Sequence, residues 1–285
     1  MIDLSHRSSY FSGSFYPEKK FELKNLLQFC FIQSSFGPQQ STKISNNNKS
    51  KVFGLIVPHG AYKFSGAISA HAFLKIITQN IDTFILIGPD HRGIGKRISI
   101  MSEGLWQTPF GDVLINDEIT KELKKNNNII LEDKLVHQFE HSLEVLIPFL
   151  QYSRINSFTI VPILMKDQDI KTSIILGNLL AKSMLGKNAI IIASCDLTHY
   201  EINSNAYKKD GKLIKSIENL DIELFYQTIM DEHISICGYG AIASLIRAVH
   251  LLGCKLGALL KYATSGDVTS DYKNPVVAYA AIAFV

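Results

Sequence analysis

Short runs of aliphatic residues recur along this chain with no polar residue alternating inside them. The run AIIIAS at 189–194 is typical, because both of its faces are apolar. Strands of this kind are found in parallel sheets that helices cover on both sides, whereas a half-exposed strand alternates apolar with polar residues. We therefore predict an α/β fold, a helix–sheet–helix sandwich with a mostly parallel central sheet. The predicted strands are 52–57, 83–88, 158–164, 189–194, 257–264 and 276–285.

Segments with the apolar period of an amphipathic helix separate these strands. This alternation, together with a length of 285 residues and a hydrophobic content of 46%, predicts a single domain over 1–285 with a large core. Residues 38–51 depart from the pattern, because they hold one aliphatic residue in fourteen, and we expect a surface or disordered loop there. The predicted helices are 19–31, 67–78, 118–125, 142–152, 170–185, 205–218, 221–230 and 240–252.

The charge balance excludes several classes of partner. Lys and Arg number 29 and Asp and Glu number 26, with no block of like charges, so we expect neither nucleic-acid nor membrane-surface binding. The longest apolar run, 276–285, is half of what a bilayer crossing requires. The four cysteines form no CxxC pair and the N-terminal residues lack the apolar stretch of a secretory signal, so we expect a cytoplasmic protein.

Polar side chains follow three of the predicted strands directly. His59 follows 52–57, His91 follows 83–88, and Asp196 and His199 follow 189–194. The carboxyl ends of parallel strands meet at one edge of a sheet, and ligands of α/β proteins bind there. The sequence therefore predicts a metal or catalytic site at this edge.

Four further residues are candidates for the same site. Cys237 precedes the predicted helix 240–252, and the positive end of a helix dipole favours the thiolate that binds metals. Asp90 can orient a neighbouring imidazole, and we expect His141 and Arg92 to line the site or contact substrate.

Each candidate taken alone also has a structural explanation. A histidine after a strand can be solvated, His141 can cap a helix, and a buried cysteine packs as a small hydrophobe. We assign His137 to the fold rather than to the site. The dinucleotide, P-loop, hydrolase-elbow and zincin signatures are missing from the sequence.

The order of short motifs along the chain resembles that of the Memo family. The motifs are GSFYP (13–17), VPHGAYKFSG (57–66), GPDHRG (88–93), TPFGDV (108–113), EHSLEVLIPFLQ (140–151), DLTHY (196–200), CGYGAI (237–242), TSGDVT (264–269) and VVAYAAIAF (276–284). The resemblance implies a fold similar to class III extradiol ring-cleaving dioxygenases, which bind non-haem iron through two histidines and a carboxylate. In the Memo family a cysteine takes the place of the carboxylate.

The resemblance also implies roles for individual residues. His59, His91 and Cys237 match the metal ligands, and His199 matches the acid/base histidine of the dioxygenases, with Asp196 in the same motif. A thiolate ligand shifts metal preference toward Cu(I), Zn or thiolate-bound iron. Cys195 stands where the family usually has a serine, so a second thiol there can compete for the metal or oxidise with Cys237.

Three hypotheses about function follow. The first is a redox protein that binds one metal ion, Fe(II) or Cu with Zn as a further candidate, in which Asp196 orients His199 for proton transfer. The second is a module for phosphorylated or acidic peptides, with His59, His91, His199 and Arg92 as donors. The third is a scaffold subunit, and the resemblance implies AMMECR-type and radical-SAM proteins as partners.

Overall fold

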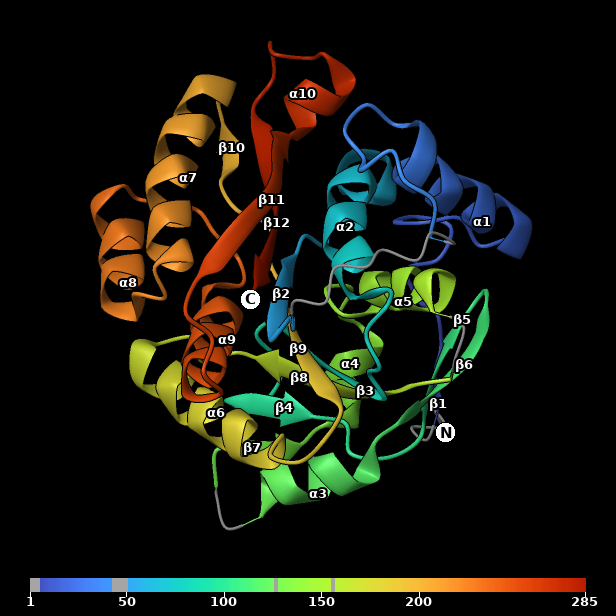
Figure 1. Cartoon of the computed structure of the whole chain (residues 1–285), viewed down its shortest axis with the longest axis vertical. Coiled ribbons are helices and arrows are strands. Elements are labelled where there is room, and N and C mark those ends of the chain that lie inside the picture. The colour runs from blue at the N-terminus through green and yellow to red at the C-terminus, as the bar shows by residue number, and fades with distance from the viewer. Residues whose placement is uncertain (1–5, 43–50, 126–127, 155–156) are drawn as a thin grey trace.

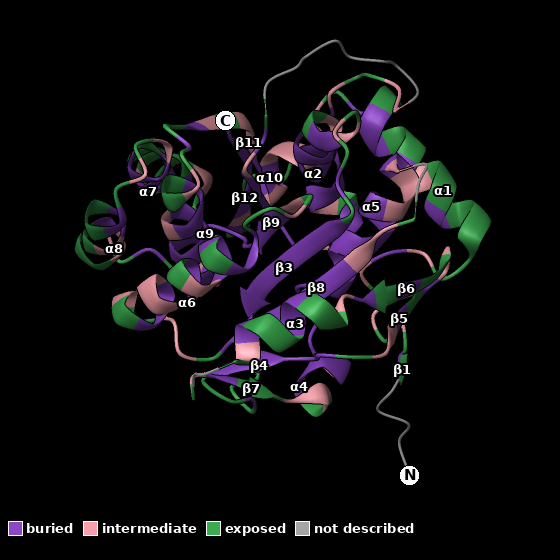
Figure 2. Ribbon diagram, turned by 60° about the horizontal axis from the view of Figure 1, so that its bottom comes forward, coloured by how far each residue is buried: buried purple, intermediate pink, exposed green. Residues whose placement is uncertain are grey.

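Four parallel strands form the centre of the computed structural model, which describes residues 6–42, 51–125, 128–154 and 157–285. The strands are neighbours in the order β8, β3, β9, β2, and nearly every residue in them is buried. Figure 2 shows β3 and β8 as a buried band through the middle of the molecule. Their bounds are β2 Gly54–Val57, β3 Thr83–Pro89, β8 Thr159–Met165 and β9 Ala189–Ser194.

Antiparallel and short strands extend this centre into a mixed, mostly parallel sheet. β12 (Val276–Phe284) pairs with β2, and β11 (Gly257–Thr264) pairs with β12. These elements confirm the last two of the six predicted strands. The strands that were not predicted have two to five residues each: β1 His6–Arg7, β4 Ile98–Ile100, β5 Leu105–Thr108, β6 Gly111–Ile115, β7 Ile130–Glu132 and β10 His199–Glu201.

Helices cover both faces of the sheet, as predicted (Figure 1). Alternate residues of β3 point into opposite cores: Ile85 and Ile87 into one, Phe84 and Leu86 into the other. One face packs on α1 (Lys20–Gln28), α2 (Tyr62–Ile76) and α5 (Ile147–Ser153). The other packs on α3 (Asp117–Lys124), α6 (Ile170–Ser183), α7 (Asn203–Glu218), α8 (Ile222–Asp231) and α9 (Tyr239–Leu251).

The helix predicted at 142–152 begins later than expected. A 3-10 turn, η2 (Glu144–Leu146), precedes α5, because Pro148 lacks the N–H that a helix interior requires and is tolerated only in the first turn. Ser142 therefore lies in the turn before the helix, which matters for the site described below. The helix predicted at 67–78 begins earlier, at Tyr62.

Two short helices were not predicted, α4 (Lys134–Gln138) and α10 (Ser265–Thr269), whereas the helix predicted at 19–31 continues past α1 into η1 (Phe29–Gln33). Within the loop expected at 38–51, residues 38–42 and 51 belong to no helix or strand, and 43–50 lie outside the described residues. None of the helices in the described part of the chain combines the length and the apolarity that a bilayer crossing needs. One sheet borders both cores, and the single domain over 1–285 stays a prediction.

A buried carboxyl group beneath β10 gives the fold a pH dependence. Asp210 has no exposed surface and accepts hydrogen bonds from the hydroxyls of Thr198 and Tyr262, both at 2.7 Å. Burial raises the pKa of Asp210 to about 6, and the two hydrogen bonds offset only part of this effect. Below pH 4 the group is protonated in both the folded and the unfolded chain, whereas above pH 6 the folded chain carries a buried carboxylate.

We expect Asp210→Asn to gain stability relative to the parent chain as the pH rises from 4 to 6, by on the order of 3 kcal/mol. Urea unfolding of both proteins at several pH values between 4 and 8 measures this difference. Asp231→Asn, at an exposed position, is the control for the loss of one carboxylate from the chain. A flat difference for Asp210→Asn would contradict the expectation.

Candidate metal centre

The ends of three neighbouring parallel strands bring the candidate residues together. β9 lies between β2 and β3, so His59 after β2, Asp196 after β9 and His91 after β3 share one edge of the sheet. The ring centroids of His59 and His91 are 5.1 Å apart. The convergence that the sequence predicted for these strand ends is therefore present.

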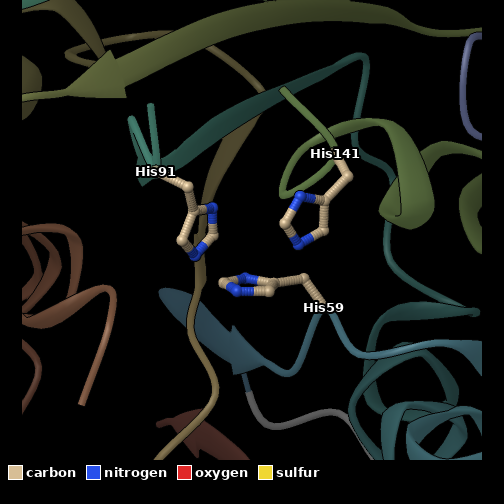
Figure 3. Close-up of side chains that lie close together, drawn as sticks. All are labelled: His59, His91 and His141. Carbon is tan, nitrogen blue, oxygen red and sulfur yellow. The ribbon is translucent and has the colours of Figure 1, made fainter. Parts of the chain in front are cut away.

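A third imidazole, from His141, completes the cluster shown in Figure 3. Its ring centroid is 5.2 Å from that of His59 and 4.7 Å from that of His91. Donor nitrogens of the three rings all lie within 4.8 Å of one another, which is close enough to hold a metal ion. The sequence predicted that His141 lines the site or contacts substrate rather than binding the metal, but its ring lies as close to those of His59 and His91 as these two lie to each other.

The tautomer of His59 follows from its hydrogen bonds. The Nδ1 atom lies 2.9 Å from the Ser194 hydroxyl, and that hydroxyl donates its one hydrogen to the carbonyl oxygen of Ser142 at 2.6 Å. The Ser194 oxygen must then accept a hydrogen from Nδ1. In the neutral form of His59 the lone pair is therefore on Nε2, which lies 3.3 Å from the sulfur of Cys237.

Glu140 orients His91 in the same manner. Its carboxylate accepts from Nδ1 and from the backbone N–H of His91, both at 2.9 Å, and also from the N–H of Ser142. Burial opposes the ionised form of Glu140, but the hydrogen bond and the charge of His91 lower its pKa to about 2. Because a carboxylate only accepts, Nδ1 of His91 carries a hydrogen, and Nε2 is the nitrogen that a metal ion can bind by displacing its proton.

The surroundings of the three rings shift their pKa values in different directions. Burial lowers the pKa of His91, but hydrogen bonds with Cys237 and Glu140 outweigh it and raise that pKa to about 10. Burial and the positive charge of His59 lower the pKa of His141 to about 3, so this ring is neutral. Its Nδ1 lies 3.2 Å from the Glu140 carboxylate.

Cys237 lies directly before α9, as the sequence predicted. Burial opposes its ionisation, but the Cys195 thiol and the imidazoles of His59 and His91 hold the pKa of Cys237 well below its ordinary value. The sulfur also lies 3.4 Å from the backbone nitrogen of Asp196. A thiolate and two oriented imidazoles therefore face one another.

Asp196 and His199 are held by different partners. Asp196 accepts hydrogen bonds from the backbone N–H groups of His59 at 2.8 Å and Gly60 at 3.3 Å, so it fastens the exit of β2 to that of β9. The Nδ1 atom of His199 lies 2.7 Å from the carbonyl oxygen of Ser235. The orientation of His199 thus comes from Ser235 and not from Asp196. The catalytic roles of His199 and Asp196 stay predictions.

Two of the remaining predicted residues, Asp90 and Arg92, lie in the loop after β3. Asp90 accepts from the backbone N–H groups of Gly93 and Gly95, so it closes this loop and leaves the orientation of His91 to Glu140. The exposed Arg92 lies with its guanidinium 5.5 Å from the ring of Phe139. His137 is fully buried beside Trp106, outside the imidazole cluster, as expected.

Comparisons with known proteins agree with the order of the motifs. A family model described as Memo-like protein matches residues 7–283. A MEMO1 family protein of Nitrosopumilus maritimus is 40% identical over 279 residues, covering 98% of this chain and 99% of that protein. A MEMO1 family protein of Thermoplasma volcanium is 41% identical over 272 residues, covering 95% of each.

A solved structure supports the architecture alone. The uncharacterized protein JW3007 of Escherichia coli K12 superposes with a TM-score of 0.54 at 13% sequence identity. The match covers 82% of this chain and all of that one, which supports the α/β sandwich. From the family model and the full-length relatives, we conclude that this chain belongs to the Memo-like protein family.

Proposed function

We propose that this chain binds one metal ion through His59, His91 and the thiolate of Cys237 and uses it in redox chemistry. The observation that carries the proposal is the pair of imidazoles whose Nδ1 atoms are both fixed, so that Nε2 of each is left for a ligand beside one thiolate. Fe(II) or Cu is favoured by the resemblance, and the thiolate also suits Zn. When bound, the ion would supply Lewis acidity or one-electron exchange.

The spacing of the donors fits such an ion. Metal–sulfur and metal–nitrogen bonds of about 2.3 and 2.1 Å at a tetrahedral angle place sulfur and nitrogen about 3.5 Å apart. The Cys237 sulfur and Nε2 of His59 are 3.3 Å apart. His141 is neutral, and a nitrogen of its ring lies within 4.8 Å of donor nitrogens of both His59 and His91, so this ring can be a further ligand.

We assign proton transfer to His199. Its Nδ1 faces the Ser235 carbonyl, which leaves Nε2 to give or take a proton. The side chain is partly exposed, so a substrate entering from the edge of the sheet can reach it. Asp196 would support this step from a distance, by keeping the strand exits in place.

A peptide-binding site for phosphate is the weaker alternative. The imidazoles that would donate to a phosphate already face anionic groups: the Cys237 thiolate for His59 and the Glu140 carboxylate for His91. A phosphate group placed there would be repelled by both anions, whereas a cation would be attracted. Calorimetric titration with phosphotyrosine peptides tests the alternative, which requires binding that a chelator does not change.

Metal titration of anaerobically purified, chelator-treated protein tests the proposal. We expect one equivalent of Fe(II), Cu(I) or Zn(II) per chain. A Cys254→Ser variant is the matched control and should bind equally, since its sulfur contacts the carbonyl oxygens of Leu256 and Val285 away from the cluster. Titration curves without a stoichiometric end point for all three ions would refute the proposal.

Glu140→Gln should weaken metal binding by about 10- to 100-fold, because the neutral amide orients His91 less firmly and lowers its basicity. Competition with a chromophoric chelator measures this change. Glu132→Gln, which alters a carboxylate that contacts Ser102 and Lys124, should bind metal as the parent chain does. Equal affinity for Glu140→Gln would argue against His91 as a ligand.

Location and protein partners are proposals of a coarser kind. All four cysteines are free, which fits a reducing compartment, and we propose the cytoplasm. The AMMECR-type and radical-SAM partners rest on the family resemblance.

A further inference from the structure

Two cysteine sulfurs lie side by side at the candidate metal centre. Each sulfur contacts the backbone next to the other cysteine: the N–H of Gly238 donates to the Cys195 sulfur at 3.1 Å, and the Cys237 sulfur lies 3.4 Å from the backbone nitrogen of Asp196. Both sulfurs also lie close to one carbonyl oxygen, that of Asp196, at 3.1 Å for Cys195 and 3.4 Å for Cys237. The two sulfurs therefore lie near one backbone carbonyl group at the end of β9.

Gly238 makes this approach possible. A Cβ atom at this position would come 2.5 Å from the Ser194 carbonyl oxygen and 2.9 Å from the Cβ of Cys195, so a larger residue would push the segment away. The backbone N–H of Gly238 instead donates to the Cys195 sulfur at 3.1 Å. This hydrogen bond holds the segment that carries Cys237 against Cys195.

The two sulfurs differ in access. Cys237 is partly exposed, whereas Cys195 has no exposed surface. A small oxidant from solvent therefore meets Cys237 first, and the thiol of Cys195, which contacts the same carbonyl oxygen, is available to react with the intermediate formed there. Of the other cysteines, Cys30 packs against Gly66 and Cys254 lies at the C-terminal end of α9.

We infer that Cys195 and Cys237 form an intramolecular disulfide when the protein meets a peroxide. The Cys237 sulfur attacks one oxygen of hydrogen peroxide, the O–O bond breaks, and hydroxide leaves, which gives a sulfenic acid and, after protonation, water. The Cys195 sulfur then attacks the sulfenic sulfur, the S–S bond forms, and the hydroxyl leaves with the Cys195 proton as a second water. The two sulfurs give up two electrons, which reduce the peroxide.

This disulfide has a consequence for the metal centre, and that half of the inference rests on the proposed function. A sulfur in a disulfide is no longer a thiolate ligand, so oxidation would release the ion. A bound ion would in turn occupy the Cys237 sulfur and slow its oxidation. The pair would act as a peroxide-sensitive control of metal occupancy.

Peptide mapping of the full chain tests the disulfide. Metal-free, fully reduced protein is treated with two equivalents of hydrogen peroxide, which suffice to carry one thiol to sulfinic acid, then unfolded in N-ethylmaleimide and digested without reductant for mass spectrometry. We expect four free thiols to fall to two, with one cross-linked pair of peptides that contain Cys195 and Cys237. Cys254→Ser should keep the cross-link, and Cys195→Ser should lose it and accumulate sulfinic acid at Cys237.

Two results would overturn the inference: sulfinic acid at Cys237 with Cys195 still alkylated in the parent chain, or no loss of thiols at all. A second experiment uses protein loaded with Zn(II), which is redox-inert. We expect the disulfide to form about tenfold more slowly and to release zinc in equal amount. If the disulfide forms while zinc stays bound, Cys237 is not a ligand and the proposed function fails alone. If zinc binds through Cys237 and no disulfide forms, only this inference fails.

Discussion

Arg7→Met is expected to lower the free energy of unfolding by about 3 to 5 kcal/mol, because it leaves a buried carboxylate without its countercharge. Arg7 and Glu144 form an ion pair in which neither side chain has exposed surface. The guanidinium also donates to the carbonyl oxygens of His137 and Glu140, each at 2.8 Å. Glu144 would keep hydrogen bonds from Tyr16 and from a backbone N–H, but no positive partner.

Chemical denaturation of the parent and variant chains measures this loss. The matched control is Lys121→Met, which removes an exposed ion pair with Asp117 and should cost less than about 1 kcal/mol. The double variant Arg7→Met with Glu144→Leu should recover part of the loss, since no charge is then left buried. Equal losses of unfolding free energy for Arg7→Met and Lys121→Met would show that the buried ion pair contributes no more to stability than the exposed one.

His59→Ala is expected to lower metal affinity by more than about 100-fold, which exceeds the effect of a residue that only orients a ligand. Its ring is almost fully buried and stands between Ser194 and Cys237, so alanine removes the imidazole nitrogen that lies beside the thiolate. The backbone of residue 59 would keep its hydrogen bond to Asp196, so the strand exit should stay in place.

Metal analysis after dialysis, with competition against chelators of graded strength, measures the affinity. His250→Ala, at an exposed position on α9, is the control and should retain the parent affinity. Cys237→Ser should lose Cu(I) more completely than Zn(II), because an alcohol is a harder donor than a thiolate. Equal metal content in His59→Ala, Cys237→Ser and the parent chain would refute the ligand assignment.

The sequence was sufficient to predict the placement of His59 and His91. Both follow wholly apolar runs, and parallel pairing of such runs through β9 leaves their carboxyl ends at one edge. The long strands and the two helix layers could be predicted for the same reason. The short strands could not, because two to five residues give too little periodicity to recognise.

The residues that orient the rings could not be predicted from the sequence. Glu140 and Ser194 stand next to predicted site residues, yet their partners are His91 and His59, 49 and 135 positions away along the chain. The first contact depends on the tertiary approach of the turn before η2 to the end of β3, and the second on the pairing of β2 with β9. The role expected for Asp90 failed for a related reason, since backbone N–H groups of its own loop occupy its oxygens first.

The turn 140–142 reaches all three imidazoles, and this has a mechanical consequence. Its first residue binds His91 and lies against His141, and its last residue holds the Ser194 hydroxyl that fixes His59. The guanidinium of Arg7 in turn donates a hydrogen bond to the carbonyl oxygen of Glu140. All three rings are thereby connected to one short turn. A displacement of this turn would therefore move the three rings together and change the geometry of the whole centre.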